Sequence, residues 1–177
     1  MTIEPKLIVM MNDFFTLRDK VYSVSDLNKL ENSLGIHFPK EYRDFLSVFH
    51  AINCSLQLNL KSKTSEIEFY FGDQAFIEEF YALEKMQEIY LEYKFLDLDL
   101  VHHSKILIIG EFFGGHEFIG IGFGENNYNN MFWIESSEWP DLGDKDNWDF
   151  NTMNKYWYDF GITFEEFMTS IECEKTE

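Results

Sequence analysis

The carboxylates are the residues of this chain whose spacing could create a functional site. Glu84, Glu88 and Glu92 recur at every fourth position, so on a helix they would form one acidic stripe. Like charges at this spacing destabilise a helix by about 0.2–0.5 kcal/mol per pair, and Lys85 and Lys94 compensate only in part. The stripe is therefore expected to be either an ordinary solvated face or a surface that binds a basic partner.

A second acidic group, between residues 138 and 149, contains two of the four tryptophans. Such dense carboxylates could bind Ca²⁺, but their spacing does not match a calcium-binding loop, so no metal is expected. Tryptophan beside carboxylates is more typical of a protein-binding surface. The residues expected to bind a partner, including two carboxylates from the intervening segment, are Glu84, Glu88, Glu92, Glu125, Glu135, Glu138, Trp139, Asp141, Asp144, Asp146 and Trp148.

Patterns typical of catalysis are weak. Gly120, Gly122 and Gly124 lie within a predicted strand and no helix follows, so they do not form a phosphate-binding loop. Glycines in a strand more often permit the close approach of a neighbouring element. His116 belongs to no zinc-binding spacing, and Cys54 has no adjacent base. We therefore expect neither an enzyme nor a cofactor.

The net charge of −18 is unevenly distributed along the chain. Residues 1–63 contain 8 Lys and Arg against 7 Asp and Glu, whereas residues 64–177 contain 6 against 25. Nucleic-acid binding depends on neutralising phosphates with Lys and Arg, so this charge argues against a nucleic-acid partner. It favours a basic protein partner, although an acidic surface also serves solubility alone.

Length and composition predict one domain over residues 1–177. The 177 residues include 19 phenylalanines, enough to build a sizeable hydrophobic core. No apolar stretch approaches the length of about 20 residues that a membrane-spanning helix needs. The two cysteines, Cys54 and Cys173, do not suggest a disulfide framework. The chain is therefore expected to be cytoplasmic.

Hydrophobic periodicity predicts the remaining elements. Alternating apolar residues predict strands at 56–60, 66–71, 105–109, 117–123 and 131–136, with an asparagine-rich turn at 126–130. Apolar spacings of three and four predict a long helix over 73–95 and shorter helices over 149–160 and 163–171. Helices before and after neighbouring strands favour an α+β fold, with a mostly antiparallel sheet of about five to six strands flanked by helices.

Residues 23–50 predict an αα-hairpin, a motif that occurs in many folds. Ser23 and Asp26 could form a capping box, and Gly35 stands where the first helix should end with a positive φ. Pro39 suits the first turn of the second helix because its missing N–H would have no partner inside the helix. The residues expected to face solvent on the second helix are Lys40, Glu41, Arg43 and Asp44.

The order of features in this hairpin resembles the opening of the SUKH superfamily, the Smi/Knr-like domains. The residues that carry the resemblance are Leu34, Gly35, Phe38, Pro39, Glu41, Tyr42, Arg43, Phe45 and Leu46. The glycine pair at 114–115 and the Phe-rich segment at 163–171 also resemble later parts of the family pattern. The resemblance implies an α+β binding module.

Many bacterial members of this superfamily look like immunity proteins that neutralise a cognate toxin, often a nuclease. The resemblance, taken with the acidic charge, leads us to expect an immunity protein whose carboxylates and tryptophans cover the active cleft of a basic toxin. An intracellular regulatory scaffold of the fungal Smi/Knr type, with no toxin partner, is the alternative. A small hydrolase is a third interpretation, which an ordered metal site among the aspartates would favour.

Overall fold

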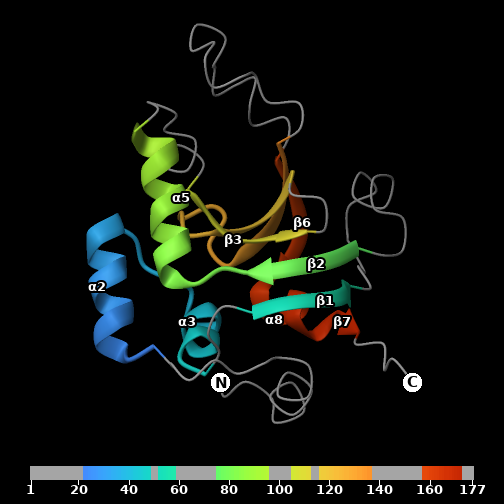
Figure 1. Cartoon of the computed structure of the whole chain (residues 1–177), viewed down its shortest axis with the longest axis horizontal. Coiled ribbons are helices and arrows are strands. Elements are labelled where there is room, and N and C mark those ends of the chain that lie inside the picture. The colour runs from blue at the N-terminus through green and yellow to red at the C-terminus, as the bar shows by residue number, and fades with distance from the viewer. Residues whose placement is uncertain are drawn as a thin grey trace, which may run out of the picture.

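Seven strands form one antiparallel sheet in the order β6-β5-β4-β3-β2-β1-β7 (Figure 1). The computed structural model describes residues 22–48, 52–58, 75–95, 105–112, 116–136 and 157–172. The elements in chain order are α2 (Val24–Leu34), α3 (Lys40–Leu46), β1 (Ile52–Leu58), β2 (Ala75–Phe80), α5 (Leu83–Phe95), β3 (Ile106–Phe112), β4 (Glu117–Gly122), β5 (Asn130–Glu135), β6 (Trp157–Thr163), α8 (Phe164–Thr169) and β7 (Ile171–Glu172). The predicted α+β fold with an antiparallel sheet is confirmed, with somewhat more strands than expected.

The hairpin of α2 and α3 begins and ends at the predicted signals. The Ser23 hydroxyl accepts a hydrogen bond from the Asp26 N–H at 3.2 Å, and the Asp26 carboxylate accepts one from the Ser23 N–H at 3.1 Å. Gly35 ends α2 with φ 68°, a left-handed conformation that glycine adopts without steric cost. Pro39 is the N-cap of α3, one residue before the helix begins.

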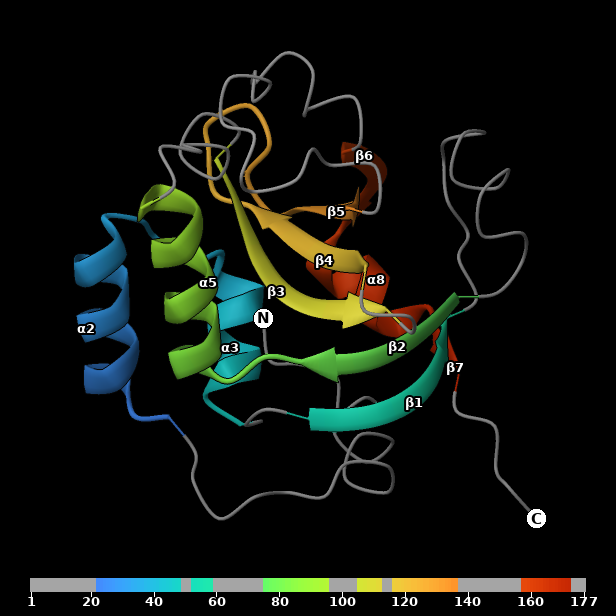
Figure 2. The ribbon, with the colours of Figure 1, turned by 45° about the horizontal axis from the view of Figure 1, so that its top comes forward.

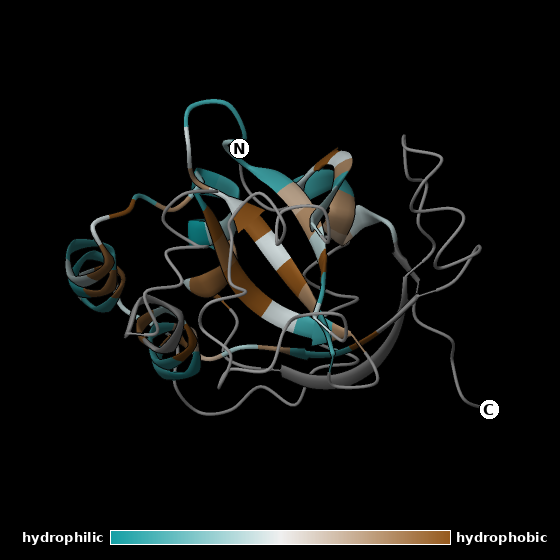
Figure 3. Cartoon of the chain, turned by 90° about the horizontal axis from the view of Figure 1, so that it is seen from above, coloured by the Kyte–Doolittle hydropathy of each residue, from teal (hydrophilic) through white to brown (hydrophobic). Residues whose placement is uncertain are grey.

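Helices α2 and α5 lie side by side and run in the same direction (Figures 1 and 2). The Tyr22 hydroxyl at the start of α2 lies 3.1 Å from Glu84 at the start of α5. Near the other end, the Tyr90 hydroxyl donates to the Leu34 carbonyl at 2.9 Å. Seen end-on, each helix has a hydrophobic side and a hydrophilic side (Figure 3). Because the two helices run in the same direction, their first turns lie together at one end of the pair.

An aromatic core joins the α-hairpin to the C-terminal helix. The chain passes from edge strand β6 to edge strand β7 through α8. Phe164 of α8 contacts Tyr42 and Phe45 of α3, with ring centroids 5.2 and 5.3 Å apart. Phe45 also packs against Phe80 of β2 at 5.6 Å. These contacts hold α3 and α8 together against the sheet.

The predicted helix over 73–95 is wrong in its first part, because Ala75–Phe80 is strand β2. This strand pairs with β1 and β3, and its register with β3 shifts between Ile77 and Glu79. The extra residue of such a bulge reverses the alternation of faces, so Ile77 and Phe80 are both buried at a spacing of three. A bulged strand can therefore imitate helical periodicity in the sequence.

The predicted helix over 149–160 is also wrong where the structure describes it, since Trp157–Thr163 is strand β6. Tyr158 stacks on Trp133 of β5, with ring centroids 4.7 Å apart and planes inclined by 24°. Aromatic pairs across strands are typical stabilising contacts of a sheet. The predicted strand over 66–71 and the rest of that helix lie outside the described residues.

The three strands β3, β4 and β5 and the final helix confirm their predictions. The turn between β4 and β5 includes Asn129 with φ 68°, as expected for an asparagine-rich hairpin. The glycines of β4 permit close packing: a Cβ on Gly120 would lie 2.7 Å from Ile106 Cγ2, and one on Gly122 1.9 Å from the Asn127 carbonyl oxygen. The interpretation of these glycines as packing positions is confirmed.

Candidate partner-binding site

The outward side of α5 carries two of the predicted carboxylates and an apolar residue. Glu84 and Glu88 are exposed, and Leu91 keeps 47% of its surface in water. The opposite side of the helix buries Met86 and Tyr90 against the rest of the protein. The spacing of i, i+4 and i+7 places Glu84, Glu88 and Leu91 on one face, which we call the α5 stripe. Glu92 lies in α5, but its side chain is outside the described part of the structure.

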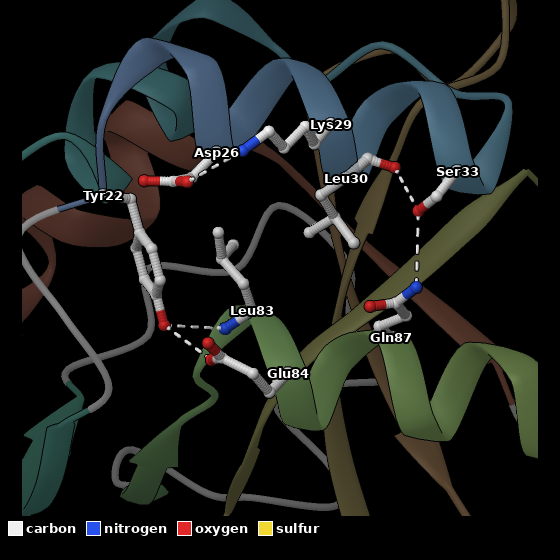
Figure 4. A pocket seen from close by; sticks show the side chains of 8 residues that line it. All are labelled: Tyr22, Asp26, Lys29, Leu30, Ser33, Leu83, Glu84 and Gln87. Carbon is white, nitrogen blue, oxygen red and sulfur yellow. Dashed lines mark hydrogen bonds and ion pairs between the residues drawn. The ribbon is translucent and has the colours of Figure 1, made fainter.

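A groove of about 270 Å³ runs between α2 and the first turns of α5 (Figure 4). Its residues are Tyr22, Asp26, Lys29, Leu30, Ser33, Leu83, Glu84 and Gln87. Leu30 and Leu83 are almost completely buried and form an apolar floor. Polar side chains from both helices surround this floor, with carboxylates at Asp26 and Glu84. The groove thus joins an apolar surface to two negative charges.

Tyr22 fixes the position of Glu84 in this groove. Its hydroxyl accepts a hydrogen bond from the Leu83 N–H at 3.0 Å and donates one to Glu84 Oε2 at 3.1 Å. The same oxygen therefore caps the first turn of α5 and orients the carboxylate next to it. Burial, and to a smaller extent the negative charge of Glu84, raise the pKa of Tyr22 to about 12. Only its place directly before the Ser23 cap could have drawn attention to Tyr22 in the sequence.

Lys85 does not neutralise the α5 stripe. Its ammonium lies 2.7 Å from Glu79 Oε2 and 4.0 Å from Glu111 Oε2, both on the sheet. It also lies 3.9 Å from the centroid of the Tyr81 ring, which is a favourable position for a cation. Because this lysine is engaged with the sheet, its charge is directed away from Glu84 and Glu88.

The structure separates the other predicted residues from the groove or does not describe them. Glu125 is exposed in the turn between β4 and β5 and lines a different pocket, together with His37 and Lys105. Glu135 ends β5 and pairs across the strands with Glu117. The predicted residues outside the described part are Glu138, Trp139, Asp141, Asp144, Asp146 and Trp148.

The fold and the hairpin motif agree with a comparison against known families. The model of the SMI1/KNR4 family (SUKH-1) matches residues 22–169. The chain belongs to the SMI1/KNR4 family. This confirms the resemblance to the SUKH superfamily, and family membership supports a Smi/Knr-type domain that acts through protein–protein interaction. No curated protein matches the chain.

A buried ion pair explains one part of the hairpin motif in this SMI1/KNR4 protein. Arg43 was expected to face solvent, but its guanidinium pairs with Glu31, whose side chain is only 8% exposed. Glu31 also accepts a hydrogen bond from the Phe38 N–H at 2.8 Å, and Arg43 donates to Asn28. We call these four residues the α2–α3 joint. The signal in the sequence was the position of Glu31 within the apolar helical spacing of α2.

Another carboxylate of this SMI1/KNR4 domain, Glu117, is half-buried and lies on the sheet. Burial raises the pKa of Glu117, and the negative charge of Glu135 on the neighbouring strand raises it further. His116 has a weaker, opposite effect. The environment of Glu117 in the folded protein therefore disfavours the charged form of its carboxylate.

Neither a metal-binding cluster nor a membrane-spanning helix is found in the described part of this SMI1/KNR4 protein. No group of three or more His, Cys, Asp or Glu side chains among those residues could hold a metal ion. No helix within the same residues is long and apolar enough to cross a membrane.

Proposed function

We propose that this protein is an immunity protein, which binds a cognate basic toxin such as a nuclease and covers its active cleft. The observation that carries the proposal is the α5 stripe, in which exposed carboxylates stand beside an exposed leucine in a member of a protein-binding family. Carboxylates supply attraction to a basic cleft, and an apolar residue beside them supplies burial on contact.

The charge of the later elements supports the same kind of partner. Residues 116–136 and 157–172 contain seven carboxylates and no lysine or arginine. A negative field of this kind accelerates the encounter with a positive surface, and salt weakens the effect. A nuclease must hold phosphate, so its cleft is expected to be positive.

The proposed mechanism is steric and electrostatic. The stripe residues Glu84, Glu88 and Leu91 would contact one part of the toxin. The acidic group that contains Asp144 and Asp146, with its two tryptophans as apolar anchors, would contact another. Enzyme chemistry has no part in this mechanism, because occupation of the cleft is sufficient to exclude the substrate.

The test compares two charge-reversed double variants with a matched control. Glu84→Lys with Glu88→Lys, and separately Asp144→Lys with Asp146→Lys, should each slow association with the toxin about tenfold at low salt. The difference from wild type should shrink as salt is added. The control makes the same change of net charge on other elements, at Asp44 of α3 and Glu78 of β2, and should slow association much less.

The toxin would be sought in the neighbouring gene and by a pull-down with this protein as bait. A large secreted protein with a toxic C-terminal domain would be the verified partner if co-expression of this protein protects cells from it. Equal association rates for wild type and both charge-reversed double variants would contradict the electrostatic mechanism. Capture of a cellular protein without toxic activity would instead support the regulatory scaffold.

A further inference from the structure

We propose that the groove between α2 and α5 is a receptor for an arginine side chain of the partner protein. The inference rests on the proposed function in one respect, namely that the partner is basic. It adds the place where one residue of that partner would insert and the groups that would hold it.

The floor of the groove suits the aliphatic part of an arginine. Leu30 and Leu83 extend toward each other from facing helices, and the ring of Tyr22 closes one end (Figure 4). Long basic side chains commonly bury their methylene groups on apolar surface while their charged end remains in a polar setting. A carboxylate side chain would gain the same apolar contact but would meet like charges at the rim.

The rim suits the guanidinium group. Asp26 on α2 and Glu84 on α5 lie on opposite sides of the groove near Tyr22 (Figure 4). Guanidinium presents five donors in a planar arrangement, so it can bond to two carboxylates at once, which an ammonium does less well. The hydrogen bond from Tyr22 occupies Oε2 of Glu84 in part, and a carboxylate can accept several further bonds. Glu84 is thereby oriented before a ligand arrives.

Lys29 competes with a ligand for Oδ1 of Asp26, whose other oxygen, Oδ2, accepts hydrogen bonds from the Ser23 N–H and hydroxyl. Its ammonium lies 3.9 Å from Asp26 Oδ1, and 76% of its side chain is exposed. An exposed pair of this kind contributes about 0–1 kcal/mol, so its loss is a small obstacle. Removal of Lys29 should consequently strengthen binding of a cationic ligand, whereas removal of a groove carboxylate should weaken it. Opposite effects from two neighbouring residues make the proposal specific.

The experiment uses N-acetyl-L-arginine methylamide as the probe and the full ¹⁵N-labelled chain as the receptor. Two-dimensional amide spectra recorded during titration should show saturable shifts concentrated at Ser33, Leu83 and Gln87. N-acetyl-L-citrulline methylamide, a neutral molecule of nearly the same shape, should bind much more weakly. The lysine analogue should bind with intermediate strength, because it lacks the planar set of donors.

Four variants test the assignment. Glu84→Gln keeps the size of the side chain and its acceptor for Tyr22, and it should raise the Kd of the arginine probe about fivefold. Glu88→Gln removes the same charge one turn further along, outside the groove, and should change the Kd less than about twofold. Lys29→Ala should lower the Kd about two- to threefold. Ser33→Phe should block the groove by filling it.

Equal effects of Glu84→Gln and Glu88→Gln, or equal binding of arginine and citrulline probes, would overturn the proposal. Shifts spread evenly over the acidic surface would also overturn it, since they would indicate general attraction of a cation. The probe requires no toxin, so this failure can be told apart from failure of the immunity function. A toxin that binds normally while the probe does not would refute the groove assignment alone.

Discussion

Glu31 and Glu88 are both helical glutamates, yet the structure gives them opposite environments. In the α2–α3 joint, Glu31 is buried, pairs with Arg43 and accepts the Phe38 N–H. On the α5 stripe, Glu88 is exposed next to Glu84 and Leu91. The joint therefore uses a carboxylate to hold two helices together, whereas the stripe presents carboxylates to solvent. Burial and partners thus distinguish a carboxylate that stabilises the fold from one that is available at the surface.

The largest expected effect comes from the joint. Glu31→Ala should lower the free energy of unfolding by about 3 kcal/mol, because it leaves the Arg43 guanidinium without its carboxylate and the Phe38 N–H without its acceptor. Urea unfolding followed by circular dichroism measures this loss. Glu88→Ala is the matched control and should stay within about 0.5 kcal/mol of wild type. Similar losses for the two variants would contradict the stabilising role of the buried Glu31 pair.

A smaller effect is expected at Tyr22, which connects the interior to the exposed face. Tyr22→Phe removes the acceptor of the Leu83 N–H and the donor to Glu84, and should cost about 1–2 kcal/mol at neutral pH. It should also weaken arginine binding in the groove, because Glu84 loses its orientation. A stable variant with wild-type arginine affinity would show that Tyr22 does not position this carboxylate.

The cost of Tyr22→Phe should depend on pH. A tyrosine in the unfolded chain loses its proton near pH 10, whereas the folded protein raises the pKa of Tyr22 to about 12. Stability from this residue is therefore present below pH 10 and is lost as pH rises toward 12. In urea unfolding, the difference between wild type and variant should be constant from pH 8 to about pH 9 and should shrink as pH rises beyond 10. Both wild type and variant should still lose some stability in that range, since burial also raises the pKa of Tyr42.

The smallest effect is expected at Glu117, whose burial is intermediate between that of Glu31 and that of Glu88. Burial and Glu135 raise its pKa, so the folded state holds the proton more tightly than the unfolded chain. Its charged form consequently destabilises the fold at neutral pH, and this penalty disappears as pH falls through the folded-state pKa. Glu117→Gln should stabilise the protein by about 0.2–1 kcal/mol at pH 7 and by less at acidic pH.

The control for Glu117 is an exposed carboxylate on the same hairpin. Glu125→Gln removes one charge from the turn and should change stability by no more than about 0.5 kcal/mol. Stabilisation by both substitutions to the same extent would point to the net charge of the protein and not to the environment of Glu117. Thermal unfolding at two pH values would measure both variants.

Local signals in the sequence predicted the ends of elements well. Ser23 with Asp26 began α2, Gly35 ended it, and the asparagine-rich turn joined β4 to β5. Each of these features depends on a few neighbouring residues, so the sequence contains the whole interaction. Periodicity failed at β2, where a bulge placed Ile77 and Phe80 on one face at helical spacing. It failed again at β6, whose pairing with β5 depends on residues more than twenty positions away.

The family, the α-hairpin, the excess of carboxylates and the acidic face of α5 could all be predicted from the sequence. These follow from composition and from interactions between residues close in the chain. Which carboxylates are buried, and which charged groups form ion pairs or hydrogen bonds, depends on the tertiary structure. It joined Glu31 to Arg43, turned Lys85 toward the sheet, and brought Tyr22 to Glu84 across 62 positions of sequence. Contacts of that kind depend on how the helices pack, and no local pattern records them.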